Sequence, residues 1–301
     1  MSEHDDIALA AEATELAYKT QTVGNRFREL PGFAVDHVFD DFWRTTGFYA
    51  VGFSGPEHTI VTIRGSEDRL DIISDADLGI PQYLRYRIAL IDYIGANLLG
   101  GRVTLVGHSL GGGLAQYLAY DAAQEFAGLR HRLTVHTHNA LGAVAGLIRL
   151  NGKYDPSLIE GITVRNYRHP TDVVSRIGGQ VGGNVFNLVV GKKGVSPVVA
   201  HSNDHFLPAK SPGALGRAEP VADDAFALER SLDELTPGLA LAAKEIISGG
   251  QRIGGAKRIL QLVMQMPAEE RLALGDAVSE FLPLKGTWNR LFRRRSVRAE
   301  R

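Results

Sequence analysis

The residues best suited to chemistry lie at 107–112, where the sequence reads GHSLGG. A β-rich apolar run precedes this segment and a helix-compatible run follows it, which is the strand–turn–helix setting of a nucleophile elbow. In so tight a turn, side chains at Gly107 or Gly111 would collide with the neighbouring strand and helix. We therefore predict that Ser109 is a nucleophile and that His108 is a structural part of the elbow. The alternative is a glycine-rich turn without chemistry.

An elbow serine needs two partners, because a hydroxyl is a weak nucleophile at its own pKa. A histidine base and an orienting carboxylate supply the activation, and in this setting they follow in the order serine, acid, histidine. Asp172 comes directly after the β-rich run 162–167 and is the predicted acid, whereas Asp155 precedes a proline and is interpreted as a turn residue. We favour His201, which follows an apolar run, as the base over His205.

The charge that develops on an attacked carbonyl oxygen needs backbone donors beside the nucleophile. Leu110, directly after Ser109, is expected to supply one N–H group to this oxyanion hole. The second donor is expected from Ser66, in the segment Arg64-Gly65-Ser66 at the end of an earlier β-run. Gly65 would allow the two backbones to approach closely.

The elements that must hold these side chains alternate between strand and helix, as an α/β sheet requires. We expect a helix at 7–20, an antiparallel hairpin from 46–53 and 59–64, and the nucleophile strand before Ser109. Further strands are expected at 133–137 and 162–167, and a glycine-rich loop or hairpin at 177–197. A helix between Pro81 and Gly100 is predicted from an apolar stripe formed by Leu84, Ile88, Ile91, Ile94 and Leu98.

Four segments resemble the class 3 (fungal-type) lipase family: 59–66 (TIVTIRGS), 107–112, 171–176 (TDVVSR) and 201–207. The likeness covers roughly residues 10 to 207. It implies an α/β-hydrolase fold, with a mostly parallel sheet and flanking helices, and a Ser109–Asp172–His201 triad. It also implies lipid ester substrates, as in a triacylglycerol lipase or phospholipase A, and no cofactor or metal. In this family a mobile lid follows the oxyanion strand, and here 67–78 is either such a lid or an amphipathic connector.

The remaining sequence predicts the organisation of the chain. We expect a catalytic domain at 1–210, a helical C-terminal extension at 211–284 and a basic tail at 285–301. The tail holds seven Lys or Arg residues and one Glu beside Trp288 and Phe292, so it would suit an anionic membrane surface or end as a solvated segment. The oligomeric state is left open.

Composition narrows the function classes. The 301 residues are 44% hydrophobic and 22% charged, with a formal net charge of −1 and no cysteine, so neither nucleic-acid binding nor thiolate chemistry is indicated. Residues 1–6 are acidic and lack the basic start and apolar core of a secretory signal, and no apolar run approaches membrane-spanning length. We therefore expect a soluble protein, either cytoplasmic or exported without a cleavable signal. His136 and His138 would share one face of a strand, but no third ligand accompanies them and no metal site is expected.

Three functions fit these observations. The first is a serine carboxylic-ester hydrolase that acts on acyl lipids. The second is a soluble short-chain esterase with the same machinery, which fold alone cannot separate from the first. The third is a binding or effector module on a hydrolase scaffold, in which the C-terminal helices contact a partner.

Overall fold

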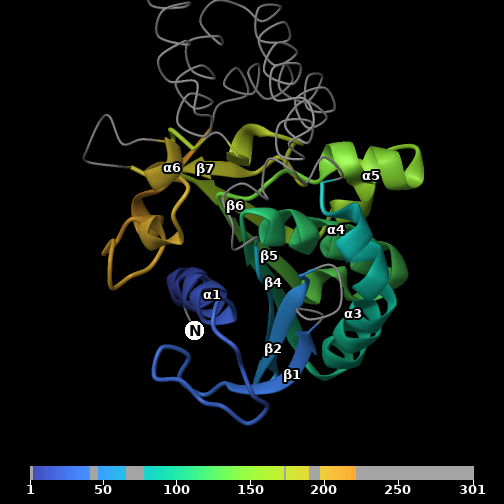
Figure 1. Ribbon diagram of the computed structural model, residues 1–301. Helices are drawn as coiled ribbons and strands as arrows, with labels where there is room; N and C mark the ends of the chain where they lie inside the picture. Colours follow the sequence, from blue (N-terminus) through green and yellow to red (C-terminus); the bar gives the residue numbers. More distant parts are fainter. Residues whose placement is uncertain (1–2, 41–46, 66–77, 173, 190–196, 222–301) are drawn as a thin grey trace, which may run out of the picture.

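The computed structural model of the chain describes residues 3–40, 47–65, 78–172, 174–189 and 197–221. Within these ranges a single mixed sheet runs through the molecule, with its strands side by side in sequence order (Figure 1). The strands are β1 (Ala34–Asp40), β2 (Tyr49–Gly55), β3 (His58–Ile63), β4 (Arg102–His108), β5 (Leu133–His138), β6 (Thr163–Arg168), β7 (Val185–Asn187) and β8 (Glu219–Pro220). Strands β3 to β7 are parallel, and antiparallel pairs lie at both ends of the sheet. The mostly parallel sheet that we expected is therefore confirmed.

Helices flank both faces of this sheet (Figure 1). The α-helices are α1 (Glu3–Ala17), α3 (Ile80–Gly100), α4 (Leu110–Glu125), α5 (Val144–Asn151) and α6 (Pro197–Ala200). The 3-10 helices are η1 (Ala127–Arg132), η2 (Pro156–Ile159), η3 (Val174–Arg176), η4 (Asn203–His205) and η5 (Leu215–Arg217). Helix α4 starts directly after β4 and contacts β3, β4 and β5, so the helix behind the predicted nucleophile lies against the middle of the sheet.

Alternation along the strands directs the apolar side chains to the two faces of the sheet. On β2, Ala50 belongs to the core that α3 and α4 cover. Its neighbours Tyr49 and Val51 belong to the core on the other face, together with Ala10, Ala13 and Leu16 of α1. Because both faces are covered, the central strands are buried along almost their whole length, as is usual for parallel strands.

Most predicted elements are confirmed, with shifted ends. The hairpin is β2 and β3, and the two later strands are β5 and β6. The first helix runs from Glu3 to Ala17 rather than from 7 to 20. Residues 177–189 contain loops and the short strand β7, which joins β6 in parallel and so forms part of the main sheet.

The apolar stripe from which α3 was predicted is exposed at its start. Leu84 is 49% exposed and Ile88 is 75% exposed, whereas Tyr83, Leu90, Ile94 and Leu98 are buried. Leu84 and Ile88, which are four residues apart, therefore lie on the outer face of the helix. The helix itself was correctly predicted: Pro81 lies in its first turn and Gly101 follows its last residue.

The sheet continues past residue 210, because β8 pairs with β7 at Asn187 and Glu219. Of the expected C-terminal extension, only the residues up to 221 are described, and they contain η5 and β8. The helices expected beyond 222 and the basic tail lie outside the described residues, so the domain boundaries stay predictions. Among the described helices, none has the length and apolarity that a membrane crossing requires.

Candidate active site

Ser109 occupies a strained turn between β4 and α4. Its backbone has φ 58° and ψ −130°, a left-handed φ that is uncommon for a residue with a side chain. Hydrogen bonds on both sides hold this conformation. The Ser109 N–H donates to the carbonyl of His138 at 3.1 Å, and its carbonyl accepts from the N–H groups of Gly112 at 3.1 Å and Leu141 at 3.0 Å. Ser109 therefore lies at a sharp turn between a strand and a helix, and its role as a nucleophile stays a prediction.

The glycines of the elbow allow three backbones to meet. A Cβ atom at Gly107 would overlap the backbone of Gly111, and one at Gly111 would overlap the carbonyl oxygen of Ile63, at the end of β3. A Cβ at Gly65 would lie 2.6 Å from the carbonyl oxygen of His108 and 3.2 Å from Cβ of Ser109. The end of β3 thus reaches the side of the predicted nucleophile.

Two hydrogen bonds join Ser109, His201 and Asp172. Oγ of Ser109 lies 2.8 Å from Nε2 of His201, and Nδ1 of His201 lies 3.0 Å from Oδ1 of Asp172. The side chains of His201 and Asp172 are 11% and 1% exposed. An ionised carboxylate can only accept, so Nδ1 carries the proton and Nε2 presents its lone pair to the serine hydroxyl. This is the tautomer in which an imidazole can remove a proton from Ser109.

Asp172 is held as an anion by the groups around it. Burial alone would raise the pKa of its carboxyl, but the neighbouring His201 and the hydrogen bonds from His201 and Ser175 outweigh burial and lower that pKa below its usual value. The N–H groups of Val174 and Ser175 donate to the carboxylate at 3.3 Å and 3.0 Å. Asp172 therefore accepts from the first residues of η3 in the same way that a capping residue does.

The loop that carries His201 is fixed by a residue that the sequence did not indicate. Asn139 follows β5 with φ 44°, a conformation that asparagine tolerates better than most residues. Its Nδ2 donates to the carbonyl of Ala200 at 2.8 Å, and its Oδ1 accepts from the N–H of His169 at 2.8 Å. The buried Asn139 side chain therefore joins the base loop to the end of β6. A polar residue directly after a buried strand was the only available signal.

The alternative acid and base lie elsewhere. Nε2 of His205 donates to the carbonyl of Val199 at 2.9 Å, and its ring lies 4.6 Å from the ring of His169. Asp155 accepts from the N–H and hydroxyl of Ser157 at 3.0 Å and 2.7 Å and caps η2. These contacts are those of a loop residue and a turn residue, and neither side chain belongs to the hydrogen-bonded group around Ser109.

Of the two backbone donors expected for an oxyanion, Leu110 lies within the described residues and Ser66 does not. Leu110 is the first residue of α4, where backbone N–H groups lack partners within the helix. Ser66 lies outside the described residues, although Gly65 directly before it adjoins Ser109. The predicted lid at 67–78 also lies outside them except for Leu78, which is buried. The roles of Ser66 and of the lid stay predictions.

His136 and His138 are both buried on β5. The ring of His138 lies 4.8 Å from Phe206 and 6.2 Å from Tyr167, so it is surrounded by aromatic side chains. Burial lowers the pKa of His138 well below its usual value, which keeps the ring neutral. Within the described ranges, no group of three potential ligand residues is gathered around a common point.

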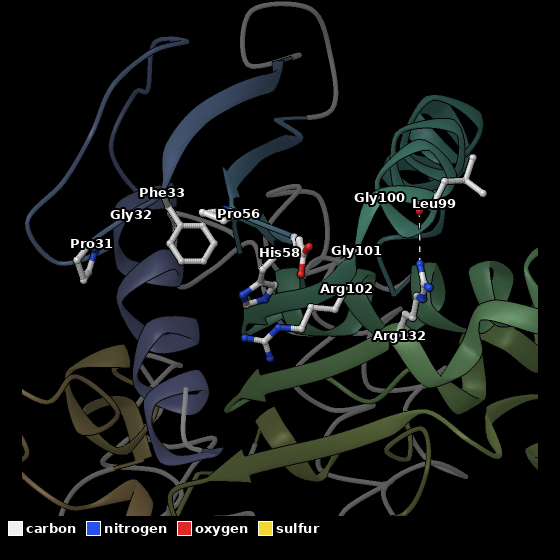
Figure 2. Close-up of a pocket in the computed structure, with 11 residues that line it drawn as sticks. Pro31, Gly32, Phe33, Pro56, His58, Leu99, Gly100, Gly101, Arg102 and Arg132 are labelled. Atoms are coloured by element: carbon white, nitrogen blue, oxygen red, sulfur yellow. Dashed lines mark hydrogen bonds between the residues drawn. The ribbon is translucent and has the colours of Figure 1, made fainter.

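A cavity of about 730 Å³ lies at the opposite end of the sheet (Figure 2). Its lining includes Phe33, Glu57, His58, Leu99, Arg102 and Arg132. Strand β4 begins at this cavity with Arg102 and ends at the elbow with His108, so about 20 Å of strand separates the two places. None of the residues bonded to Ser109 lines the cavity.

No protein-family model matches the sequence, and a search of curated proteins returns no significant match. Among solved structures, the native propeptide complex of Rhizomucor miehei lipase is 14% identical, with 68% of this chain and 77% of that one covered and a TM-score of 0.48. A Penicillium expansum triacylglycerol lipase is 18% identical, with 69% and 87% covered and a TM-score of 0.47. A Penicillium cyclopium protein is 15% identical, with 73% and 84% covered and a TM-score of 0.46. At this level the likeness to fungal lipases does not by itself assign an activity to the chain.

Proposed function

We propose that this protein is a serine carboxylic-ester hydrolase that acts on acyl lipids, of the triacylglycerol lipase or phospholipase A type. The observation that carries the proposal is the hydrogen-bonded series Ser109–His201–Asp172, with contacts of 2.8 Å and 3.0 Å. A strained elbow presents the serine, the histidine has the tautomer of a base, and the carboxylate is held ionised. Together these features activate a hydroxyl group for attack on an acyl carbon.

In the proposed reaction, Oγ of Ser109 attacks the ester carbonyl carbon while Nε2 of His201 takes the hydroxyl proton. The C=O bond opens to a tetrahedral oxyanion, which accepts hydrogen bonds from the N–H groups of Leu110 and Ser66. Asp172 stabilises the imidazolium that forms on His201 and does not take its proton. His201 then protonates the departing alkoxide, the C–O bond breaks, and an acyl-serine ester remains.

Water completes the cycle by the same steps. His201 removes a proton from a water molecule, whose oxygen attacks the acyl carbon, and the second tetrahedral oxyanion collapses to release Oγ of Ser109. His201 returns the proton to that oxygen, so the products are an alcohol and a carboxylic acid and the enzyme is regenerated. The side chains of the triad and the backbone donors suffice for every step.

A fluorophosphonate probe tests the nucleophile directly. Wild-type protein should form a covalent adduct located by mass spectrometry at Ser109, and Ser109→Ala should form none. Ser54→Ala, which changes a serine on β2 far along the chain from the elbow, is the matched control and should be labelled like the wild type. A folded wild-type sample that stays unlabelled would contradict the proposal and favour the binding or effector module.

The lipid substrate class is supported by the family motifs at 59–66, 107–112 and 171–176 and requires its own test. Hydrolysis should be compared on triacylglycerol emulsions, phospholipid vesicles and short water-soluble esters, with Ser109→Ala as the blank. The lipid proposal predicts higher turnover on aggregated lipid than on any soluble ester. Turnover confined to the soluble esters would instead identify a short-chain esterase with the same machinery.

A further inference from the structure

His108 makes contacts on both sides of its ring that the reaction scheme does not use. Its Nε2 lies 2.7 Å from the backbone carbonyl oxygen of His201, and its Nδ1 lies 2.9 Å from the hydroxyl of Tyr18. The ring is buried, and its centroid is 4.9 Å from the centroid of the His201 ring. A side chain next to the predicted nucleophile therefore bonds to the backbone of the predicted base, 93 residues later in the sequence.

These partners determine where the proton of His108 must lie. A backbone carbonyl can only accept, so Nε2 of His108 is the donor to His201. In a neutral ring Nδ1 is then an acceptor, and it accepts from the Tyr18 hydroxyl. Burial, followed by the nearby charge of His201, lowers the pKa of His108 to about 3, so the ring is neutral at ordinary pH. One tautomer thus satisfies both contacts at once.

We propose that His108 is a positioning residue for the catalytic base: its Nε2–H bond holds the His201 backbone so that the His201 ring meets Ser109. This inference rests on the proposed function and assigns a role in it to a residue outside the triad. Asp172 constrains His201 through the ring atom Nδ1, whereas His108 constrains it through the main chain. With both in place, the two ends of the residue are fixed and Nε2 points at the serine hydroxyl.

The anchor of His108 is itself built into the fold. Tyr18 directly follows α1, which covers one face of the sheet and contacts β3, β4 and β5. A Cβ placed on Gly65 would lie 2.7 Å from the Tyr18 hydroxyl, so this hydroxyl is also beside the end of β3. The series Tyr18–His108–His201 therefore connects the first helix, the nucleophile strand and the base loop, which are brought together only in the folded chain.

Two substitutions separate the contacts of His108. In His108→Gln, the amide nitrogen lies three bonds beyond Cβ, like Nε2 of histidine, and can still donate to the His201 carbonyl. In His108→Asn, the amide lies two bonds beyond Cβ, like Nδ1, and can accept from Tyr18 but does not reach His201. His131→Asn, at an exposed position in η1, is the matched control for the chemical change.

The expected result is a loss of turnover without a loss of substrate binding. For His108→Asn, kcat per titrated active site should fall about 10- to 100-fold, because small misplacements of a catalytic group cost up to about that much, and KM should stay within about twofold. His108→Gln should recover to within about threefold of wild type, and His131→Asn should match wild type. Equal kcat for the Asn and Gln variants, whether both high or both low, would overturn the proposal.

Nitrogen NMR of the imidazoles keeps the inference testable if a variant does not fold or the protein hydrolyses no ester. The wild type should show His108 as the neutral Nε2–H tautomer from pH 5 to 8, and a cationic ring or an Nδ1–H tautomer would overturn the assignment. The His201 nitrogen signals should shift in His108→Asn more than in His108→Gln. Absence of Ser109 labelling in the wild type contradicts the proposed function alone, whereas unshifted His201 signals contradict the positioning role alone.

Discussion

The ring of His201 and the carboxylate of Asp172 meet in a 3.0 Å hydrogen bond at a place where almost no solvent reaches either side chain. In such surroundings a charge–dipole contact is stronger than in water, and its loss leaves a buried group without a partner. The direction of this bond also decides which nitrogen of His201 faces Ser109. We therefore expect this pair to affect both the proposed chemistry and the acid stability of the site.

Asp172→Asn should reduce kcat by about 10³- to 10⁴-fold with little change in KM, as expected when the orienting acid of such a triad is replaced. The asparagine amide would donate to Nδ1 of His201, so the ring proton would move to Nε2, where it blocks proton transfer from Ser109. Steady-state kinetics on a soluble ester measures the effect. Asp155→Asn changes only a turn aspartate and should match the wild type, so equal losses in the two variants would contradict the assigned acid.

The same carboxylate predicts a pH dependence of stability. The folded-state pKa of Asp172 is below its ordinary value of 3.8, so its ionisation stabilises the fold above that value and the contribution is lost as pH falls through the folded-state pKa. Relative to Asp172→Asn, the wild type should gain unfolding free energy between about pH 2 and pH 5 and then remain level. Urea unfolding of both proteins across this range is the measurement. A relative gain toward acid pH would show that the carboxyl is destabilised as an anion.

Ser109→Ala and His201→Ala should each abolish nearly all ester hydrolysis, and the double variant should be little worse than either. Members of one triad act as a unit, so their losses do not add. His205→Ala, whose ring donates to Val199 rather than to the serine, should retain activity. Circular dichroism must show that each variant is folded. Retained turnover in His201→Ala together with loss in His205→Ala would identify His205 as the base.

Gly111→Ala should destabilise the fold and reduce activity, because its methyl group would overlap the carbonyl oxygen of Ile63 and push β3 away from α4. Overpacking of this kind costs about 1–3 kcal/mol, which urea unfolding can resolve. Gly128→Ala is the matched control: a Cβ there meets nothing within 4 Å, and surface changes usually stay within about 0.5 kcal/mol. An equally small effect at Gly111 would mean that the elbow backbone relaxes without cost.

Part of the turn at Ser109 could be predicted from the sequence because one of its constraints is local. Gly107 is required by the backbone of Gly111 and Gly112, a few residues later. Gly111, in contrast, is required by the backbone at the end of β3, which is distant in the sequence, so the GHSLGG pattern shows the glycine but not the strand that it meets. Asp172 and His201 were proposed from a rule of chain order and from the runs before them. Their actual meeting with Ser109 depends on β6 and α6, which no local pattern places.

Features that depend on distant contacts were missed for the same reason. The apolar stripe of α3 indicated a helix, but the exposure of Leu84 and Ile88 could not be read from it, because which side of a helix is buried depends on how the helix lies on the sheet. His108 was assigned only a structural part in the elbow, because its partner Tyr18 lies 90 residues earlier. Asn139 gave only the weak signal of a polar residue after a buried strand, since its contacts are made to Ala200 and His169, which follow much later in the chain.

The basic segment 285–301 lies outside the described residues and keeps the prediction made from its sequence. Removing it should weaken binding to anionic vesicles while hydrolysis of a short soluble ester is unchanged. All residues of the hydrogen-bonded site precede 202, so the truncation removes none of them. Near an anionic surface each basic residue is worth about 1 kcal/mol, and Trp288 and Phe292 suit the interface.

Changes of ionic strength and substitutions of the basic residues test whether the attraction to anionic vesicles is electrostatic. Because the screening length is about 8 Å at 0.15 M salt, vesicle binding of the full-length protein should decline as ionic strength rises past that value. Replacement of Arg293, Arg294 and Arg295 by Gln removes three of the seven basic residues and should reproduce a corresponding part of the loss while the apolar residues remain. Vesicle cosedimentation at low salt is the measurement, with neutral vesicles as the control. Equal affinity of the full-length and truncated proteins for anionic vesicles would exclude a membrane role, and the segment would then be a solvated end or a contact for another protein.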